Sequence, residues 1–252
     1  MIIPPNIIVN ADDFGYSEKV NEAITEAFIH GYINRTTLMV NMPAVSSALL
    51  LAQKYGFHNK VGLHLNLTEG TPVTTGMKQC DFFCKDGLFK GNIRSLVKKP
   101  IKRSTRDILK DEIKAQIERY FELGLTLCHL DSHHHVHTEI LVIRLIESVL
   151  SKESTDFRSI RIARNLCDHK FSTLPKTIYK SLLNSHLKKH HDTTDYFGSY
   201  QDFTNFQAMI DPGKKCEIMV HPVLINGVLM DKTDGGKLVK IIGHYDYERK
   251  QD

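Results

Sequence analysis

The densest group of chemically active side chains lies between His129 and His137, where five imidazoles and one carboxylate occur within nine residues. The group follows a short apolar run at 125–128, so we expect a strand that leads into it. If the chain stays extended, His129, Asp131 and His133 point to the same face, because side chains alternate along a strand. Imidazole and carboxylate are common ligands of divalent cations, and burying them unpaired is costly. The segment therefore predicts a metal site rather than a solvated histidine tract.

Paired carboxylates follow the first apolar run of the chain. Residues 7–9 have the pattern of a strand, and Asp12 and Asp13 come just after it. Adjacent carboxylates repel each other when both are ionised, so one is often neutralised by a cation while the other exchanges a proton. A helix N-cap is the alternative interpretation, since Asp suits that position and a helix is expected to begin near Ser17. The motif alone does not decide between the two.

Two further strand-like segments carry one histidine each. In the segment 61–67 the apolar side chains alternate with His64 and Asn66, which share the opposite face. Taken alone, a strand histidine is more often a core residue than a ligand. The segment 217–222 is again a strand pattern, and it closes on His221. Active sites of parallel α/β folds collect at the carboxyl ends of strands, so these segments together predict one shared site.

The rest of the sequence alternates between helix and strand patterns. We expect helices over 17–30, 46–55, 104–123, 139–150, 174–187 and 204–210. We expect further strands over 36–41, 127–131, 159–163 and 196–198. With 252 residues, this alternation predicts an α/β fold, either a (β/α) barrel or an open parallel sheet, in one domain over residues 1–252. A long loop excursion at about 68–103 interrupts it, and turn signals followed by a polar tail close the chain.

The composition is that of an ordinary soluble globular protein, with 41% hydrophobic and 25% charged residues. The net charge of +4 is mild, and the basic cluster at 98–103 lacks a nucleic-acid motif, so we expect no nucleic-acid partner. No stretch approaches the roughly 20 apolar residues of a membrane span, and the first residues lack a signal-peptide pattern. Five scattered cysteines fit reduced thiols and a cytoplasmic protein.

Four motifs resemble those of the YdjC-like carbohydrate deacetylases, which include the chitooligosaccharide deacetylases. They are 10–15, 62–65, 129–137 and 220–222, and they occur in the family's order over most of the chain. The resemblance implies a distorted (β/α) barrel of mostly parallel strands that hydrolyses the N-acetyl group from small acetylated sugars. In that case Phe82, Phe83 and Phe89 of the long excursion could stack on sugar rings, although a local core is an equally good interpretation.

The resemblance also implies roles for single residues. Asp13, His64 and His133 would bind one divalent metal, Asp12 would be the general base and His221 the general acid. A metal can polarise an acetyl carbonyl and lower the pKa of bound water from about 15.7 toward 7. A histidine with a pKa of about 6.5 suits protonation of the leaving amine.

Neighbouring residues are expected to support these groups. Asp131, His129, His137 and Asn66 would orient the ligands or contact the sugar. The resemblance implies Mg²⁺ as the metal, whereas two imidazoles and one carboxylate favour Zn²⁺, Mn²⁺ or Fe²⁺ by ligand preference. The sequence is also compatible with a homodimer, and it gives neither the sugar nor the acetyl position.

Three other functions remain open on the sequence. His129 and Asp131 with a distant histidine fit the facial triad of non-haem iron oxygenases, although the predicted helices count against an all-β scaffold of that kind. A metal-dependent phosphoesterase would need a phosphate-binding cluster, for which Arg161 and Arg164 are available. A non-catalytic metal- or sugar-binding protein would be indifferent to Asp12→Asn.

Overall fold

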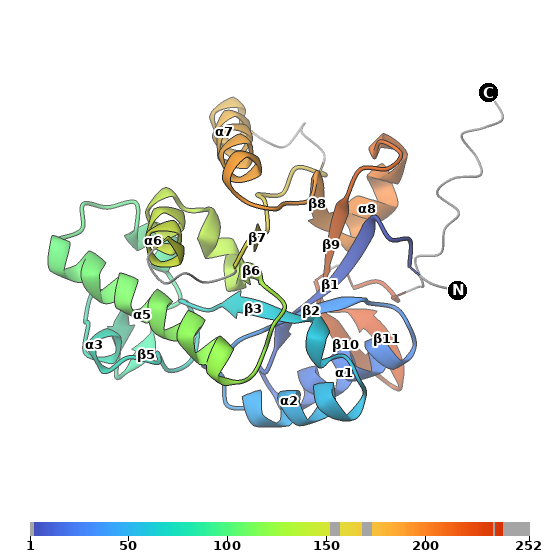
Figure 1. Ribbon diagram of the computed structural model, residues 1–252, viewed down its shortest axis with the longest axis horizontal. Helices are drawn as coiled ribbons and strands as arrows, with labels where there is room; N and C mark the ends of the chain where they lie inside the picture. The colour runs from blue at the N-terminus through green and yellow to red at the C-terminus, as the bar shows by residue number, and fades with distance from the viewer. Residues whose placement is uncertain (1–2, 152–156, 168–172, 234, 239–252) are drawn as a thin grey trace.

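The computed structural model describes residues 3–151, 157–167, 173–233 and 235–238. Its main sheet has seven strands in the order β7-β6-β3-β2-β1-β9-β8, and every pairing within it is parallel (Figure 1). The strands are β1 Ile7–Phe14, β2 Arg35–Leu38, β3 Val61–Leu65, β6 His129–Ser132, β7 Ser159–Ile160, β8 Tyr196–Ser199 and β9 Cys216–Val220. The carboxyl ends of these strands lie on one side of the fold, as a shared site requires.

The sheet curls until its two edge strands meet. A parallel bridge joins Ser159 of β7 to Asp192, which shortly precedes β8. Beyond β7, the backbone N–H groups of Asn165 and Leu166 donate to the carbonyl of Phe197 in β8, at 3.1 and 3.0 Å. These few bonds take the place of a regular ladder between β7 and β8. The fold is therefore a distorted (β/α) barrel, and the predicted fold class is confirmed.

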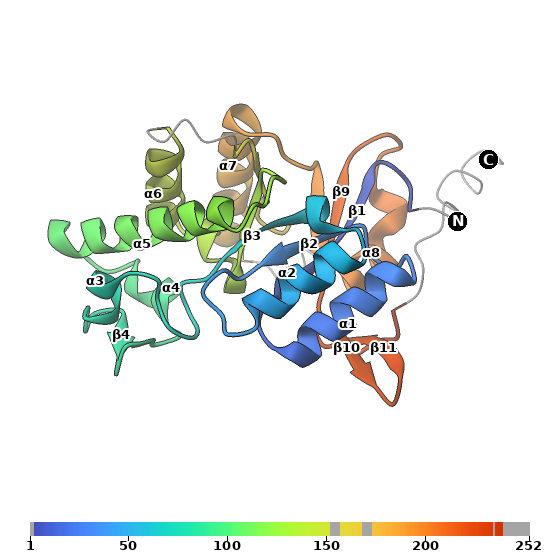
Figure 2. The ribbon, with the colours of Figure 1, turned by 60° about the horizontal axis from the view of Figure 1, so that its bottom comes forward.

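Helices cover the outside of the barrel, and Figure 2 shows α1 and α2 side by side over β1 and β2. The longer helices are α1 Glu18–Ile29, α2 Val45–Lys54, α5 Arg103–Glu122, α6 Ile140–Leu150, α7 Leu174–His190 and α8 Tyr200–Phe206. Short 3₁₀ helices are η1 His58–Lys60, η2 His133–Thr138 and η4 Gln207–Met209. The apolar side chains of β1 and β3 that face these helices, such as Val9 and Leu63, are buried. This outer layer is the hydrophobic core, and the barrel interior is left to polar residues.

Side-chain caps mark the start of α1, of α8 and of the short helix α3 Thr75–Lys78. Ser17 caps α1, since its hydroxyl accepts a hydrogen bond from the N–H of Val20 at 3.3 Å. The helix expected over 204–210 was misplaced, because a capping box formed by Ser199 and Asp202 starts α8 earlier. The helix expected over 104–123 is α5, which begins at Arg103 with Lys102 at the N-cap position.

The excursion after β3 contains short elements of its own, α3 Thr75–Lys78, β4 Cys84–Lys85, β5 Leu88–Phe89 and α4 Ile93–Leu96. The buried carboxylate of Glu112 in α5 anchors it by accepting hydrogen bonds from the N–H groups of Val73 and Thr74, at 2.9 and 2.8 Å. Phe83 and Phe89 are 2% and 8% exposed. Phe83 and Phe89 therefore belong to a local core, which was the second of the two interpretations.

After β9 the chain forms a hairpin of β10 Pro222–Ile225 and β11 Val228–Asp231. Asn226 and Gly227, whose sequence is one of the turn signals near the end of the chain, form its turn, and both have the positive φ that a tight two-residue hairpin turn requires. The polar tail expected at 243–252 lies outside the described residues. Within the described part of the chain, no helix is both long enough and apolar enough to cross a membrane.

Candidate metal and catalytic site

The carboxyl ends of β1 and β3 and the start of η2 bring three of the predicted residues together. Oδ1 of Asp13 lies 3.2 Å from Nε2 of His64 and 2.8 Å from Nδ1 of His133. One ligand atom from each residue lies within 4.8 Å of the others, which is close enough for a single metal ion. Three groups that are remote in the sequence thus converge on one point.

An irregularity in β1 separates the two adjacent carboxylates. Asp13 has a φ of 70°, in the left-handed region, and the register between β1 and β2 shifts between Ala11 and Phe14. As a result Asp12 points into the barrel, where it is 2% exposed, while Asp13 turns toward the pocket. Neither carboxylate caps α1, so the N-cap interpretation of this motif is wrong.

The strand that leads into the histidine-rich segment ends earlier than predicted. β6 ends at Ser132, and His133 begins η2. His134 and His135 then adopt left-handed backbone angles, with φ of 54° and 53°. The chain does not stay extended to His133, which reaches Asp13 from the turn and not from the strand face.

Asp131 holds the ring of His64 from behind. The register of β3 and β6 places the two residues opposite each other, and Oδ1 of Asp131 lies 2.6 Å from Nδ1 of His64. The hydroxyl of Thr37 donates to the second oxygen of Asp131 at 3.1 Å. Because the carboxylate can only accept, Nδ1 carries the proton and Nε2 is directed at Asp13. A carboxylate behind a histidine is the arrangement that orients metal-binding imidazoles.

In the neutral form of His64, no proton lies between its Nε2 and Asp13. With Nδ1 of His64 committed to Asp131, Nε2 of the neutral ring has no hydrogen to offer to Asp13. Nδ1 of His133 approaches the same oxygen of Asp13 at 2.8 Å, while its Nε2 faces Oε1 of Glu69 at 3.5 Å. One carboxylate oxygen and two ring nitrogens that meet at one point are the ligand types of a divalent cation, so they fit a site built for a cation.

Without a cation, His64 takes up a proton, and its positive charge offsets part of the negative charge of the nearby carboxylates. Burial would lower the pKa of His64, but the carboxylates of Asp131 and Asp12 outweigh that effect and raise the pKa to about 10. A metal ion bound at Nε2 would replace this proton, since an imidazole binds metal only in its neutral form.

Arg161 organises the inner part of the site. Its guanidinium donates to both oxygens of Asp12, at 2.8 Å each, and Nη2 lies 2.6 Å from Oδ2 of Asp131. Its Nε donates to Glu217 at 2.7 Å. Burial would raise the pKa of Asp12, but the charge of Arg161 and its hydrogen bonds outweigh burial and hold the pKa well below its usual value. Asp12 is therefore ionised at neutral pH.

The charges of this interior do not balance by themselves. Asp12, Asp13, Asp131 and Glu217 bring four carboxylates. Against them stand Arg161 and a second guanidinium, that of Arg35, whose Nη2 lies 2.7 Å from Oε1 of Glu217. When the histidines are neutral, two negative charges remain, and buried charges are stable only when compensated. One divalent cation at Asp13 would supply that compensation.

These groups open onto one pocket of about 450 Å³, whose lining includes Asp12, Asp13, His64, His133 and His221. His221 follows β9 directly, and Asp231 accepts a hydrogen bond from its backbone N–H at 2.7 Å. Nδ1 of His221 lies 2.9 Å from the hydroxyl of Thr233, which orients the ring. All five residues to which a metal-binding or catalytic role was assigned thus face the same cavity.

His129 and His137, expected near the ligands or the sugar, lie behind the pocket wall. Nδ1 of His129 lies 2.8 Å from the hydroxyl of Ser159 in the barrel interior. Nε2 of His137 donates to the carbonyl of Arg161 at 3.1 Å, and burial lowers its pKa to about 3, so this ring is neutral. Neither ring lines the pocket, and their contacts favour a role in holding Arg161 and its strand.

Asn66 is also buried, and its side chain forms hydrogen bonds within its own loop. Its Oδ1 accepts from the N–H groups of Thr68 and Glu69 at 3.1 Å, and its Nδ2 donates to the carbonyl of Glu69 at 2.8 Å. These contacts favour a structural role, in shaping the chain between β3 and the excursion, over contact with a sugar.

The structure weighs against two of the alternative functions. Arg161 is fully buried and occupied by three carboxylates, and Arg164 pairs with Asp202 at 2.5 Å, so they do not form a phosphate site at the pocket. Among the described residues, the metal-capable group that contains His129 has no second histidine, as a facial triad needs. The importance of Arg161 was missed in the sequence. A lone arginine within the apolar run 159–163 was the available signal.

The sequence matches the family model described as YdjC-like protein over residues 6–252. It is 34% identical to a carbohydrate deacetylase from Geobacillus stearothermophilus over 227 residues, which are 89% of this chain and 82% of the relative. It is 38% identical to a carbohydrate deacetylase from Vibrio cholerae over 157 residues, 62% of this chain and 60% of the relative. The crystal structure of a candidate cellobiose-phosphate cleavage protein from Enterococcus faecalis V583 superposes with a TM-score of 0.67 at 22% identity, covering 87% of this chain and 81% of that one. That similarity supports the barrel fold.

Proposed function

The chain belongs to the YdjC-like family, and from this premise we propose that it is a metal-dependent carbohydrate deacetylase. Its substrates would be small N-acetylated sugars such as chitooligosaccharides, and its products acetate and the free amine. The observation that carries the proposal is the convergence of Asp13, His64 and His133 in a pocket that also holds Asp12 and His221. The names of the relatives support the substrate class.

Asp13, His64 and His133 would hold one divalent cation. The fit rests on three observations: a carboxylate oxygen and two ring nitrogens that share a point, a carboxylate behind His64, and four carboxylates that face two guanidiniums. A bound ion supplies Lewis acidity, which polarises the acetyl carbonyl and makes bound water a stronger acid. Ligand type favours Zn²⁺ or Mn²⁺, and the family resemblance favours Mg²⁺.

Asp12 is the proposed general base. Arg161 keeps its carboxylate ionised and fixes both of its oxygens, so the orientation of the base is set before substrate binds. The same pairing makes Asp12 a weak base, because its low pKa opposes proton uptake. A weak base can remove a proton only from a water molecule whose pKa has been lowered. In our proposal Asp12 can therefore act as the base only when the ion is bound.

His221 is the proposed general acid. When the tetrahedral intermediate collapses, the C–N bond breaks, the acetyl carbon leaves as acetate with the oxygen from water, and the amine needs a proton. Thr233 fixes Nδ1 of His221 at 2.9 Å, which leaves Nε2 to protonate the amine.

The test is an acetate-release assay on N-acetylated mono- and disaccharides, before and after removal of divalent cations. Release that stops with a chelator and returns with added Zn²⁺, Mn²⁺ or Mg²⁺ supports the proposal. Release that is independent of metal would contradict the assigned mechanism. A protein that only binds metal and sugar would bind these sugars without releasing acetate.

A further inference from the structure

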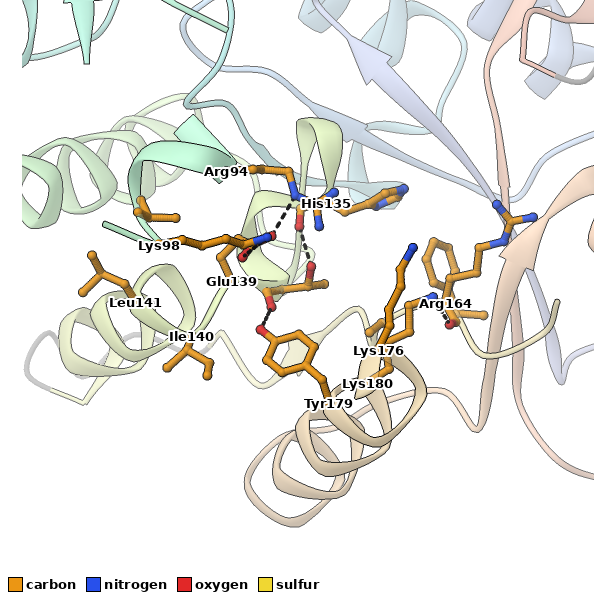
Figure 3. Close-up of a pocket in the computed structure, with 14 residues that line it drawn as sticks. Arg94, Lys98, His135, Glu139, Ile140, Leu141, Arg164, Lys176, Tyr179 and Lys180 are labelled. Carbon is orange, nitrogen blue, oxygen red and sulfur yellow. Dashed lines mark hydrogen bonds and ion pairs between the residues drawn. The ribbon is translucent and has the colours of Figure 1, made fainter. Parts of the chain in front are cut away.

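His133 differs from the other two proposed ligands in the way its backbone is held. Asp13 and His64 lie within β1 and β3, whereas His133 begins the 3₁₀ helix η2. This helix also borders a second pocket of about 590 Å³, whose lining includes His135 and Phe197 (Figure 3). Strand pairing therefore does not fix the ring of His133 as it fixes that of His64, and neighbouring side chains must do so.

Arg94 of α4 holds the main chain of η2. Its Nε donates to Oε1 of Glu139, the residue after η2, at 2.8 Å, and its Nη1 donates to the carbonyl of His134 at 3.3 Å. Figure 3 shows Arg94 and Glu139 together at the wall of the second pocket. These bonds fix the main chain of the turn, and the ring of His133 needs partners of its own.

Glu69 faces the second nitrogen of the His133 ring. Nδ1 of His133 lies 2.8 Å from Asp13, and its Nε2 lies 3.5 Å from Oε1 of Glu69. The second distance is slightly longer than an N–H···O hydrogen bond of roughly 2.7–3.2 Å. The side chain of Glu69 is 35% exposed, so it has room for the small movement that would complete this bond.

Metal binding at His133 would give Glu69 a defined partner. The nitrogen of His133 that faces Asp13, and with it the point shared with His64, is Nδ1. An imidazole that binds a cation through Nδ1 is neutral and carries its proton on Nε2. That proton would point at Glu69, whose ionised carboxylate can only accept. A carboxylate behind a metal-binding imidazole fixes both the tautomer and the orientation of the ring.

Asn66 places Glu69 for this contact. Its Oδ1 accepts from the backbone N–H of Glu69 at 3.1 Å, and its Nδ2 donates to the backbone carbonyl of Glu69 at 2.8 Å. Asn66 follows β3 directly, and β3 carries His64. The strand that presents one imidazole therefore also leads into the turn that presents a carboxylate to the other.

Glu69, His133 and His134 also lie close enough together to hold a cation of their own. Nε2 of His134 is 3.9 Å from Oε1 of Glu69, and the side chain of His134 is 50% exposed. A neutral imidazole has one lone pair for a cation, so His133 cannot serve two ions without losing its last proton. If His133 binds the ion beside Asp13, Glu69 is therefore left as a hydrogen-bond acceptor.

We propose that Glu69 is a positioning residue that accepts the Nε2 proton of His133 and thereby directs Nδ1 at the metal site. This inference rests on the proposed metal-dependent function. It gives each of the two imidazole ligands a carboxylate of its own, Asp131 for His64 and Glu69 for His133.

Two variants test the proposal, Glu69→Leu and Glu69→Gln, with Zn²⁺ alone as the probe. Leu removes the acceptor, whereas Gln keeps an acceptor oxygen without the charge. Glu118→Leu, at a 49% exposed position of α5 away from both pockets, is the control. Thermal unfolding of each metal-free variant checks that the fold is intact.

With Glu69→Leu we expect the Kd for Zn²⁺, measured by competition with a chelator, to rise roughly 10-fold. Glu69→Gln should lie between Glu69→Leu and the unsubstituted protein, and Glu118→Leu should match the unsubstituted protein. Equal affinity in Glu69→Leu and the unsubstituted protein would overturn the proposal.

NMR of the His133 ring separates positioning from a merely structural role. In the zinc-loaded protein we expect the ring proton on Nε2, exchanging slowly with water, and faster exchange of that proton in Glu69→Leu. A proton on Nδ1 would overturn the proposal. Two zinc ions per chain, one of them lost in Glu69→Leu, would also overturn it, because Glu69 would then be a ligand.

Failure of the underlying function would look different. If the unsubstituted protein bound no divalent cation, the metal site and the role of Glu69 would fail together. If it bound Zn²⁺ with the expected differences among the variants but released no acetate from any N-acetylated sugar, the role of Glu69 would stand and the deacetylase assignment would fail.

Discussion

Nδ1 of His64 lies 2.6 Å from Oδ1 of Asp131, and the two residues are direct partners in the register of β3 and β6. Strand pairing thus fixes the tautomer of a proposed metal ligand. It also couples that ligand to Arg161, which Asp131 contacts through its other oxygen at 2.6 Å. The proposed metal site and the proposed base are therefore joined through one guanidinium.

The first prediction concerns Asp131→Asn. The amide no longer holds His64 as a carboxylate does, so metal affinity should fall about 10- to 100-fold, as measured by competition with a chelator. Glu217→Gln is the matched control, because it also removes a carboxylate from Arg161 but does not touch His64. Equal affinity in Asp131→Asn and the unsubstituted protein would refute the orienting role.

The second prediction separates the two adjacent carboxylates. Asp12→Asn should lower acetate release by about 10²- to 10⁴-fold while metal remains bound, because general base catalysis is lost and the ligand set is kept. Asp13→Asn should lose the metal itself. Metal content by elemental analysis, measured alongside turnover, distinguishes them, and near-normal turnover by Asp12→Asn would rule out the assigned base.

The third prediction concerns the stability of the barrel interior. Arg161→Leu leaves Asp12, Asp131 and Glu217 buried without their shared cation, so the free energy of unfolding should fall by roughly 3–5 kcal/mol. Denaturant unfolding measures this loss. Adding Asp12→Asn to Arg161→Leu should restore part of the stability, because it removes a buried carboxylate whose ion pair within the described residues is with Arg161. A further loss in the double variant would argue against this charge model.

The fourth prediction concerns pH. Burial would raise the pKa of Glu217, but the charges of Arg35 and Arg161 outweigh burial and hold it well below the usual 4.5. The folded state therefore binds the proton more weakly than the unfolded state does, and the contribution to stability is full above the unfolded pKa and decreases as pH falls below it. The difference in unfolding free energy between the unsubstituted protein and Glu217→Gln should stay constant from pH 8 to about 5 and shrink below about 4. A difference that grows in acid would contradict the assigned ionisation.

The fifth prediction concerns removal of the ion. If a divalent cation binds only the folded protein, added metal at about 100 times its Kd should raise the free energy of unfolding by about 2.7 kcal/mol. Asp13→Asn should show no such response. Thermal unfolding of the metal-free protein with and without Zn²⁺, Mn²⁺ or Mg²⁺ measures the effect and ranks the three ions.

The features that could be predicted from the sequence are those with local or periodic signals. The alternation over 61–67 correctly placed His64 inside the barrel, because side-chain direction in a strand depends only on position. Ser17 marked the start of α1 for an equally local reason. The placement of chemistry at strand ends predicted one shared site, because parallel strands end together, and the family resemblance named Asp13, His64 and His133, which do lie together.

The features that were missed depend on contacts between distant segments. Asp12 and Arg161 are 149 positions apart, and no local pattern indicates that a buried arginine will join them. The left-handed turn at His134 and His135 has no glycine or proline to signal it, so the route by which His133 reaches the pocket could not be read from the chain. Glu112 likewise anchors the excursion only because α5 packs beside it.

Phe197 serves two parts of the molecule with different atoms. Its backbone carbonyl accepts two of the hydrogen bonds that close the barrel, and its ring packs against that of His135. A motion that separates the two edges of the barrel would therefore also move the ring of Phe197. Because Phe197 and His135 both line the pocket of about 590 Å³, a change that weakens the closure of the barrel would also alter the wall of this pocket.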